Sequence, residues 1–217
     1  MAVITRIEAN KRNKRRYSIY IDHRYFTSLD EEVLARNHLQ EGMVVDEESM
    51  GPILYQDELR CAYNKSISYL GYRSRSRKEV ADYLERKGFS TEVIEKTLEK
   101  LESYRFVDDE DFARIWVRNR KDGKLMGKRI ISQELIHKGV DREIIEDALK
   151  EITEEDELRK AIQLVQRTLP KYSKLAKKEQ AYKTGQVLAR KGFGWEVIRK
   201  ALRAVWDQAE DLEDLDS

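Results

Sequence analysis

Hydrophobic residues recur at helical spacing along most of the chain. Near the end of the first third, one apolar stripe consists of residues three and four apart, namely Val80, Tyr83 and Leu84. Ser76 and Glu79 precede the stripe at the spacing of an S-x-x-E capping box, and Gly88 follows it where helices commonly end. The pattern predicts an amphipathic helix over residues 77–87.

The same pattern is written three times. The stretches LERKGFSTEVIEKTL, LIHKGVDREIIEDAL and LARKGFGWEVIRKAL begin at Leu84, Leu135 and Leu188, and six of their fifteen positions are identical in all three. A near-constant period of about 50 residues is typical of helical repeat proteins. Each stretch contains a glycine where one helix is expected to end in the left-handed conformation, so that the next can fold back: Gly88, Gly139 and Gly192.

The fold class we predict is mainly α, with tandem three-helix repeats in an elongated array and the curvature between repeats left open. The expected boundaries are 55–106 for repeat one, 107–152 for repeat two and 153–206 for repeat three. Residues 1–54 form a small N-terminal α/β appendage, and residues 207–217 form an acidic C-terminal tail.

The N-terminal appendage is predicted from β-forming residues. The segments VITRIE and YSIYI flank the basic run NKRNKRR, which is consistent with a two-stranded ribbon and a basic connection. The segment YFTSL adds a third short strand, and a brief helix over residues 31–36 follows.

Charge is distributed unevenly along the chain. The 217 residues are 40% hydrophobic and 38% charged, with a net charge of +1. Residues 207–217 hold six acids and no base, which leaves a basic body with 42 cations against 35 anions. Such a body suits a protein that meets polyanions or competes with them. A solubilising C-terminus is the alternative explanation for the tail alone.

Several function classes lack their signatures. The single Cys61 is expected in the core, and the three histidines lack the spacing of a metal site. The chain has no P-loop, G-x-S-x-G or H-E-x-x-H motif, and Asp108 and Asp109 suit helix capping better than catalysis. We therefore expect no enzyme activity, no metal and no cofactor. The lack of a signal peptide or a long apolar segment predicts a cytoplasmic protein with no membrane contact.

The cations offer the clearest candidate chemistry. We expect partner contacts, either to carboxylates of a protein or to phosphates of DNA, at Arg73, Arg75, Arg77, Lys78, Arg114, Arg118, Arg120, Lys124, Lys128 and Arg129. The first four stand at a helix start, where the dipole disfavours cations unless an anion is present. The alternative is that they are solvated surface charges. Trp116 is expected in the core rather than as a base-stacking platform.

Three motifs resemble the RecX family of bacterial regulatory proteins, which modulate the RecA recombinase. The motifs are Leu70-x-x-Arg73-x-Arg75-Ser76-x-x-Glu79, then Lys87-Gly88-Phe89, then Asp108-Asp109-x-x-Phe112-Ala113 followed by Trp116. The resemblance covers residues 55–206, and residues 1–54 resemble an extra segment found in some members.

The resemblance implies a non-enzymatic regulator, expected as a monomer, that binds the RecA filament on single-stranded DNA. It implies reduced ATP hydrolysis, strand exchange and coprotease activity in recombination, DNA repair and the SOS response. Two alternatives remain open: a direct DNA-binding protein, on single-stranded or double-stranded DNA, built from helix-turn-helix-like repeats, and a helical scaffold for another partner.

Overall fold

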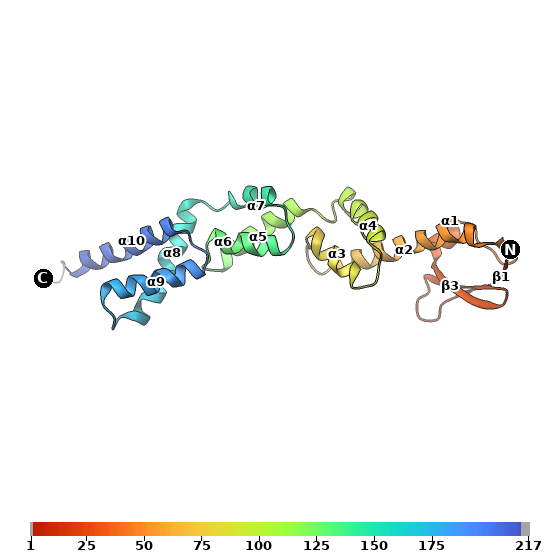
Figure 1. Ribbon diagram of the computed structural model, residues 1–217, viewed down its shortest axis with the longest axis horizontal. Helices are drawn as coiled ribbons and strands as arrows, with labels where there is room; N and C mark the ends of the chain where they lie inside the picture. Colours follow the sequence, from red (N-terminus) through yellow and green to blue (C-terminus); the bar gives the residue numbers. More distant parts are fainter. Residues whose placement is uncertain (1, 214–217) are drawn as a thin grey trace. The chain divides into compact units, whose positions relative to one another are not determined.

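The computed structural model describes residues 2–213, which form a mainly helical chain with one sheet near the N-terminus (Figure 1). The chain divides into two compact bodies. The N-terminal body holds residues 2–75 and 79–107, and the C-terminal body holds residues 76–78 and the described residues from 108 onward.

The sheet in the N-terminal body has four antiparallel strands in the order β3-β2-β1-β4, with bounds Ala2–Ala9 (β1), Arg16–Ile21 (β2), Arg24–Asp30 (β3) and Val44–Val45 (β4). Ile4, Ile19 and Leu29 are fully buried. The sequence predicted three of these strands. It missed β4, because two residues are too few to show an alternating pattern.

Two helices complete the core beneath the sheet. Helix α1 (Glu31–Arg36) lies where the sequence placed it, and α2 (Glu47–Leu70) begins eight residues before residue 55, the predicted start of repeat one. Asp46 and Ser49 form a capping box that starts α2, and Pro52 lies in its second turn. Residue 54, the predicted end of the appendage, therefore lies inside a continuous helix.

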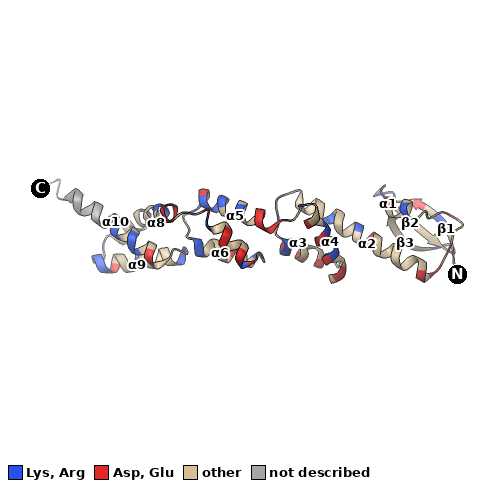
Figure 2. Ribbon diagram, turned by 90° about the horizontal axis from the view of Figure 1, so that it is seen from above, with Lys and Arg blue, Asp and Glu red and all other residues tan. Residues whose placement is uncertain are grey.

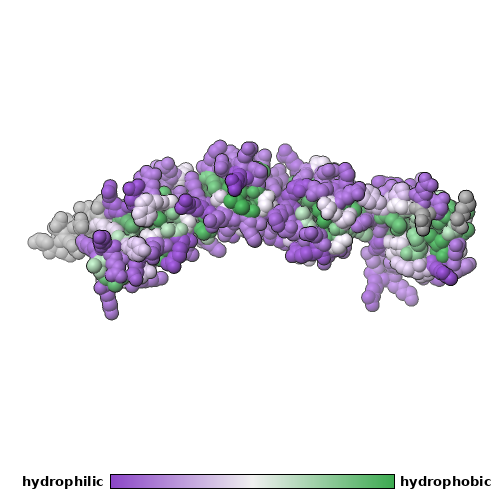
Figure 3. All heavy atoms as spheres, in the orientation of Figure 1, coloured by the Kyte–Doolittle hydropathy of each residue, from purple (hydrophilic) through white to green (hydrophobic). Residues whose placement is uncertain are grey.

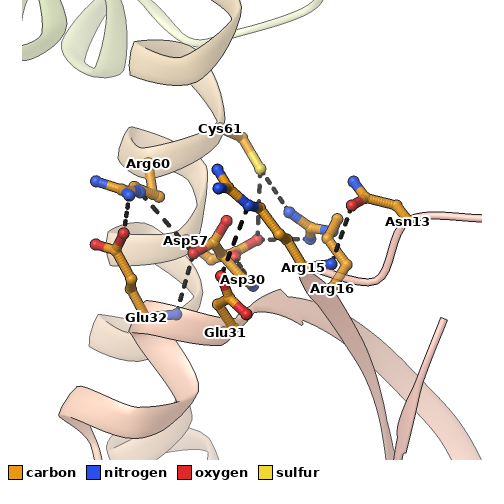
Figure 4. A network of polar contacts seen from close by, with 9 residues as sticks. All are labelled: Asn13, Arg15, Arg16, Asp30, Glu31, Glu32, Asp57, Arg60 and Cys61. Atoms are coloured by element: carbon orange, nitrogen blue, oxygen red, sulfur yellow. Dashed lines mark hydrogen bonds and ion pairs between the residues drawn. The ribbon is translucent and has the colours of Figure 1, made fainter.

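A polar network joins the sheet to α2 (Figure 4). Arg16 on β2 donates from Nη2 to Asp57 Oδ2 at 2.8 Å and from Nη1 to Cys61 Sγ at 2.7 Å, while the Asp30 backbone N–H donates to Asp57 Oδ1 at 2.6 Å. Burial opposes the charge of Arg16, but its bonds to Asp57 raise its pKa above the ordinary value. Arg60 extends the network by pairing with Glu32 and Asp30.

Cys61 is half-buried and takes part in this network, so the expectation of a core cysteine is wrong. Burial and the neighbouring Asp57 raise the pKa of its thiol. A raised pKa keeps the thiol protonated and poorly nucleophilic at neutral pH.

The helices of repeat one pack around a separate apolar cluster. Helices α3 (Arg77–Glu85) and α4 (Thr91–Ser103) pack with α2. Leu84, Leu98 and Leu101 in this cluster are fully buried. The N-terminal body thus contains two cores, one under the sheet and one in repeat one, and α2 contributes to both.

The C-terminal body contains repeats two and three. Its elements are α5 (Asp109–Gly123), α6 (Lys128–His137), α7 (Arg142–Leu149), α8 (Glu154–Thr168), the 3₁₀ turn η1 (Leu169–Tyr172), α9 (Lys177–Arg190) and α10 (Trp195–Glu213). Each repeat has its own apolar cluster. Leu135 and Leu188, which correspond to Leu84 in the repeat pattern, are also fully buried. The first seven residues of the predicted acidic tail lie in α10, and residues 214–217 lie outside the described part of the chain.

One face of α5 packs into the core of repeat two, and Ile115 lies outside that face. Phe112, Ala113 and Val117 are buried and Trp116 packs against them, but Ile115 is 39% exposed. At about 100° per residue, Ile115 lies roughly 130° from the centre of this face. Counted from Phe112, the residues that pack into the core are therefore i, i+1, i+4 and i+5.

The repeat glycines have the left-handed backbone that the sequence predicts, with φ of +86° at Gly88, +76° at Gly139 and +84° at Gly192. Gly192 also allows a close approach between repeats two and three. A Cβ added at Gly127 would lie 2.3 Å from the Gly192 carbonyl oxygen, and the Gly127 N–H donates to Lys191 O at 2.9 Å. No larger residue fits at either glycine without moving backbone.

Most of the face in view is hydrophilic, with hydrophobic residues visible in smaller areas over the helices and the sheet (Figure 3). Both cations and acids lie on the helices from α3 to α9 (Figure 2). The acids beside each cation decide which of the predicted contact residues remain available to a partner.

Candidate partner-binding site

Arg73 and Arg75 are held by their own surroundings in the N-terminal body. Arg73 binds Glu79 through two hydrogen bonds of 2.8 and 3.2 Å, and the bond to Glu79 raises the pKa of Arg73. Arg75 stacks at 4.1 Å over the ring of Tyr69, which in turn stacks on Tyr83 at 4.2 Å. A carboxylate and two aromatic rings thus offset the unfavourable position of these cations at a helix start.

Arg77 and Lys78 belong to the C-terminal body. The Arg77 backbone N–H donates to Asp109 Oδ1 at 2.8 Å. The stem of Lys78 lies against Gly139, where an added Cβ would come within 2.5 Å of Lys78 Cδ. Ser76 is fully buried and donates its hydroxyl to Lys138 O at 2.6 Å. Ser76, Arg77 and Lys78 therefore contact other residues of the C-terminal body.

The predicted contact residues Arg114 and Arg118 on α5 pair with acids of the same repeat. Arg118 binds Glu151 through two hydrogen bonds of 2.9 and 3.1 Å, and Arg114 lies 3.9 Å from Asp147 on α7. The bond between Arg118 and Glu151 raises the pKa of the arginine and lowers that of the glutamate. Both pairs are exposed to solvent, so each contributes little to stability.

Arg120 faces α6 instead. It binds Glu134 Oε2 at 2.7 Å and lies 4.4 Å above the ring of Trp116. The Trp116 ring nitrogen donates to the same carboxylate at 2.8 Å. Trp116 therefore packs against the core with its polar edge satisfied, as the sequence suggested.

Lys128 and Arg129 lie at the start of α6. The Lys128 backbone N–H donates to Glu157 Oε1 at 3.1 Å, and the Arg129 N–H donates to Gly192 O at 3.3 Å. The Arg129 side chain is exposed, and the structure gives it no carboxylate partner among the described residues.

Lys124 lies in a groove that the sequence did not predict. The groove has a volume of about 520 Å³ and separates the end of α5 from α8. We call it the cation groove, after its five lining cations: Lys121, Lys124, Arg159, Lys160 and Arg167. Of the ten predicted contact residues, only Lys124 lines it.

Two acids partly neutralise the cation groove. Asp156 binds Lys121 at 2.6 Å and also pairs with Arg159, and its bond to Lys121 lowers the pKa of Asp156 from 3.8 to about 2. Burial lowers the pKa of Lys160, its neighbours Lys121 and Arg159 lower it further, and Asp122 and Asp156 oppose them. The lining thus carries more cations than its acids neutralise.

Lys124 and Arg167 lack a carboxylate partner among the described residues. Arg159, Lys160 and Arg167 are not among the contact residues predicted from the sequence. The signal was present, since Arg159, Gln163 and Arg167 are four residues apart and share one face of α8.

The described residues contain no group of three or more His, Cys, Asp and Glu side chains arranged to hold a metal ion. Among residues 2–213, no helix combines the length and apolar character that crossing a bilayer requires. What the cations can do chemically is attract carboxylates or phosphates.

Comparison with domain families finds four matches along the chain. They are the RecX N-terminal domain at residues 2–46 and the first, second and third RecX three-helix domains at residues 62–101, 108–149 and 154–202. The three helical matches fall within the three repeats.

Relatives and solved structures agree with these matches. The chain is 35% identical over 215 residues to the regulatory protein RecX of Bacillus cereus strain B4264, covering 97% of this chain and 80% of the relative. It is 34% identical to that of Bacillus thuringiensis subsp. konkukian, with the same coverage. A crystal structure of regulatory protein RecX matches with a TM-score of 0.77 and 32% identity over 92% of this chain and 98% of the other. RecX from Lactobacillus salivarius matches with a TM-score of 0.66 and 29% identity over 69% and 97%.

Proposed function

Because the chain belongs to the RecX family of regulatory proteins, we propose that it binds the filament that RecA forms on DNA and inhibits that filament. Family membership makes it a regulator and not an enzyme. The observation that carries the proposal is the match of all four RecX domains to one chain.

The proposed inhibition covers ATP hydrolysis, strand exchange and the coprotease role of the filament in recombination, DNA repair and the SOS response. We propose that the protein acts as a monomer. Three repeats with separate apolar clusters and separate sets of cations support several weak contacts along one filament, and linked contacts bind more tightly than any one alone.

The cations differ in how readily they could meet the filament. Lys124 and Arg129 have no carboxylate of their own among the described residues, so they can contact a RecA carboxylate or a DNA phosphate directly. Arg73, Arg118 and Arg120 must first exchange a carboxylate of this chain for one of the partner. We therefore propose that Lys124 and Arg129 contribute most to binding among the predicted residues.

Titration of RecA ATPase activity on single-stranded DNA tests the function. We expect ATP turnover to fall when the protein is present at less than one molecule per RecA. Unchanged turnover at equimolar protein would overturn the proposal.

A charge-reversed pair, Lys124→Glu with Arg129→Glu, tests the residues. It should inhibit at least tenfold more weakly, whereas the control pair Lys65→Glu with Lys171→Glu, of equal charge change, should inhibit normally. Equal loss in both pairs would assign the effect to net charge rather than to these two positions.

Direct binding to DNA is a second candidate, which the cation groove favours. Each cation that meets a phosphate releases a counterion, so affinity should fall steeply with salt. The variant Arg167→Glu should reduce the slope of log affinity against log salt by about 1. A shallow slope that the variant leaves unchanged would contradict this second function.

A further inference from the structure

A second groove lies in the N-terminal body, and none of the ten predicted contact residues lines it. It is bounded by α1, the middle of α2 and the middle of α4, and its volume is about 280 Å³. We call it the α1–α2–α4 groove. Its volume lies just below the range of about 300–1,000 Å³ that drug-sized ligands occupy, so it suits one or two side chains of a peptide.

The floor of this groove is apolar. Val33, Leu59 and Tyr63 line it, and the last two are only half-buried, so apolar surface remains open to a ligand. Thr97 also lines the groove. It is 2% exposed, and its hydroxyl has no hydrogen-bond partner among the described residues. Well-packed interiors rarely leave a buried hydroxyl without a partner.

Four cations surround this floor: Arg36, Arg60, Lys96 and Lys100. Arg36 and Lys100 have no carboxylate partner among the described residues, and Lys100 lies 4.7 Å above the ring of Tyr63. Lys96 reaches only the exposed Glu99, at 3.4 Å. Glu32 is the one acid of the lining, so the charge of the lining is strongly positive.

Arg60 gives the groove a fixed wall. Its guanidinium pairs with Glu32 and lies 3.8 Å from Asp30, within the network that joins the sheet to α2 (Figure 4). Across the same helices, Asn37 donates to Gln56 Oε1 at 3.1 Å. A groove held in shape before binding loses less conformational entropy when a ligand enters.

We propose that the α1–α2–α4 groove binds an acidic peptide segment that also carries apolar side chains, such as alternating Leu or Phe with Asp or Glu. One apolar side chain covers Leu59 and Tyr63, and the flanking carboxylates meet Arg36 and Lys100. A nucleic-acid phosphate fits less well, because it would leave the apolar side chains of the floor exposed to water. The inference is independent of the proposed function, since it uses neither RecA nor DNA.

The probe is a fluorescein-labelled eight-residue peptide in which Leu and Phe alternate with Asp and Glu, titrated with the full chain and followed by fluorescence anisotropy. We expect a dissociation constant of roughly 10–100 µM, as for a small single-site contact. Two control peptides separate the contributions: one with Gln and Asn in place of the acids, the other with Ser in place of the apolar residues. Both should bind at least tenfold more weakly.

The matched protein variants are Arg36→Glu with Lys100→Glu, and the control Lys14→Glu with Lys65→Glu in the same body. The first pair should weaken peptide binding at least tenfold with unchanged circular dichroism, and the control pair should leave it unchanged. Hydrogen exchange should show peptide-dependent protection in residues 31–36, 56–63 and 96–100.

Three results would overturn the inference. They are equal binding of the serine peptide, equal loss in both protein pairs, and competition by tripolyphosphate or a single-stranded oligonucleotide that is as strong as competition by unlabelled peptide. The last result would assign the groove to phosphates. None of these results depends on RecA inhibition, so the two proposals succeed or fail separately.

Discussion

The junction between the sheet and α2 and the cation groove both contain arginines and acids. At the junction these residues hold two elements together, whereas in the cation groove some cations remain available to a partner. At the junction, Arg16 meets Asp57, whose side chain is only 11% exposed, and their bonds fix β2 to α2. In the cation groove, Lys124 and Arg167 face solvent without a carboxylate among the described residues. The number of cations in a region therefore says less about binding than the acids around them.

The largest expected effect is at the junction. Asp57→Ala removes the carboxylate that accepts from the Arg16 guanidinium and from the Asp30 backbone N–H. The guanidinium then keeps Ser28 O and Cys61 Sγ as acceptors but loses its counter-charge. Removing one partner of a buried pair costs about 3–5 kcal/mol, and because Arg16 is partly exposed we expect about 2–3 kcal/mol. Urea denaturation measures the loss, with the exposed Glu48→Gln on the same helix as control. A loss of stability below about 0.5 kcal/mol would mean that the Arg16–Asp57 pair contributes no more than an exposed ion pair does.

A smaller effect on stability is expected at Asp156, and only at acidic pH. Its pKa is lowered from 3.8 to about 2 in the folded state, so it stabilises the fold above about pH 4. That stabilisation is lost as the pH falls from about 4 to 2. Asp156→Asn should therefore lose stability less steeply over this window than the natural chain, measured by thermal unfolding at each pH. The neighbouring Glu155→Gln should follow the natural chain, and parallel curves for all three proteins would contradict the assignment.

In the cation groove itself, stability should hardly change. Lys124→Glu with Arg167→Glu removes no ion pair of the described residues, so we expect a shift within about 0.5 kcal/mol in the free energy of unfolding. The comparison between the two regions would fail if this pair destabilised the chain as much as Asp57→Ala does.

The smallest effect is expected at Arg118. Its pair with Glu151 is well formed but exposed, so Arg118→Gln should give a urea midpoint that cannot be distinguished from that of the natural chain. A clear downward shift would show that the pair between α5 and Glu151, just after α7, helps to hold repeat two together.

The three repeats could be predicted from the sequence because the same residues recur at matching positions. Buried leucines and left-handed glycines at matching offsets indicate the three-helix units without any tertiary information. The strand β4 depends on pairing with the distant strand β1, so local pattern could not locate it. The start of α2 does have a local signal, the capping box of Asp46 and Ser49, which the predicted boundary at residue 54 did not use. The division at residues 107 and 153 stays a prediction.

The candidate site was harder to predict for a physical reason. Sequence spacing indicates which residues share a helix face, but not which acid lies opposite. Arg114 and Arg118 are four residues apart and share one face of α5, yet that face meets Asp147 and Glu151. Lys124 and Arg167 lie 43 positions apart and share a groove only because α8 folds against the end of α5.

The contact between Gly127 and Gly192 has a mechanical consequence. Backbone of repeat two bonds directly to the turn of repeat three there, with no side chain between them that could adjust. If either repeat unfolds, the other loses packing and a backbone hydrogen bond. When residues 108–213 are stretched from their ends, we therefore expect one unfolding event instead of two. Repeats that look modular in sequence would then break together.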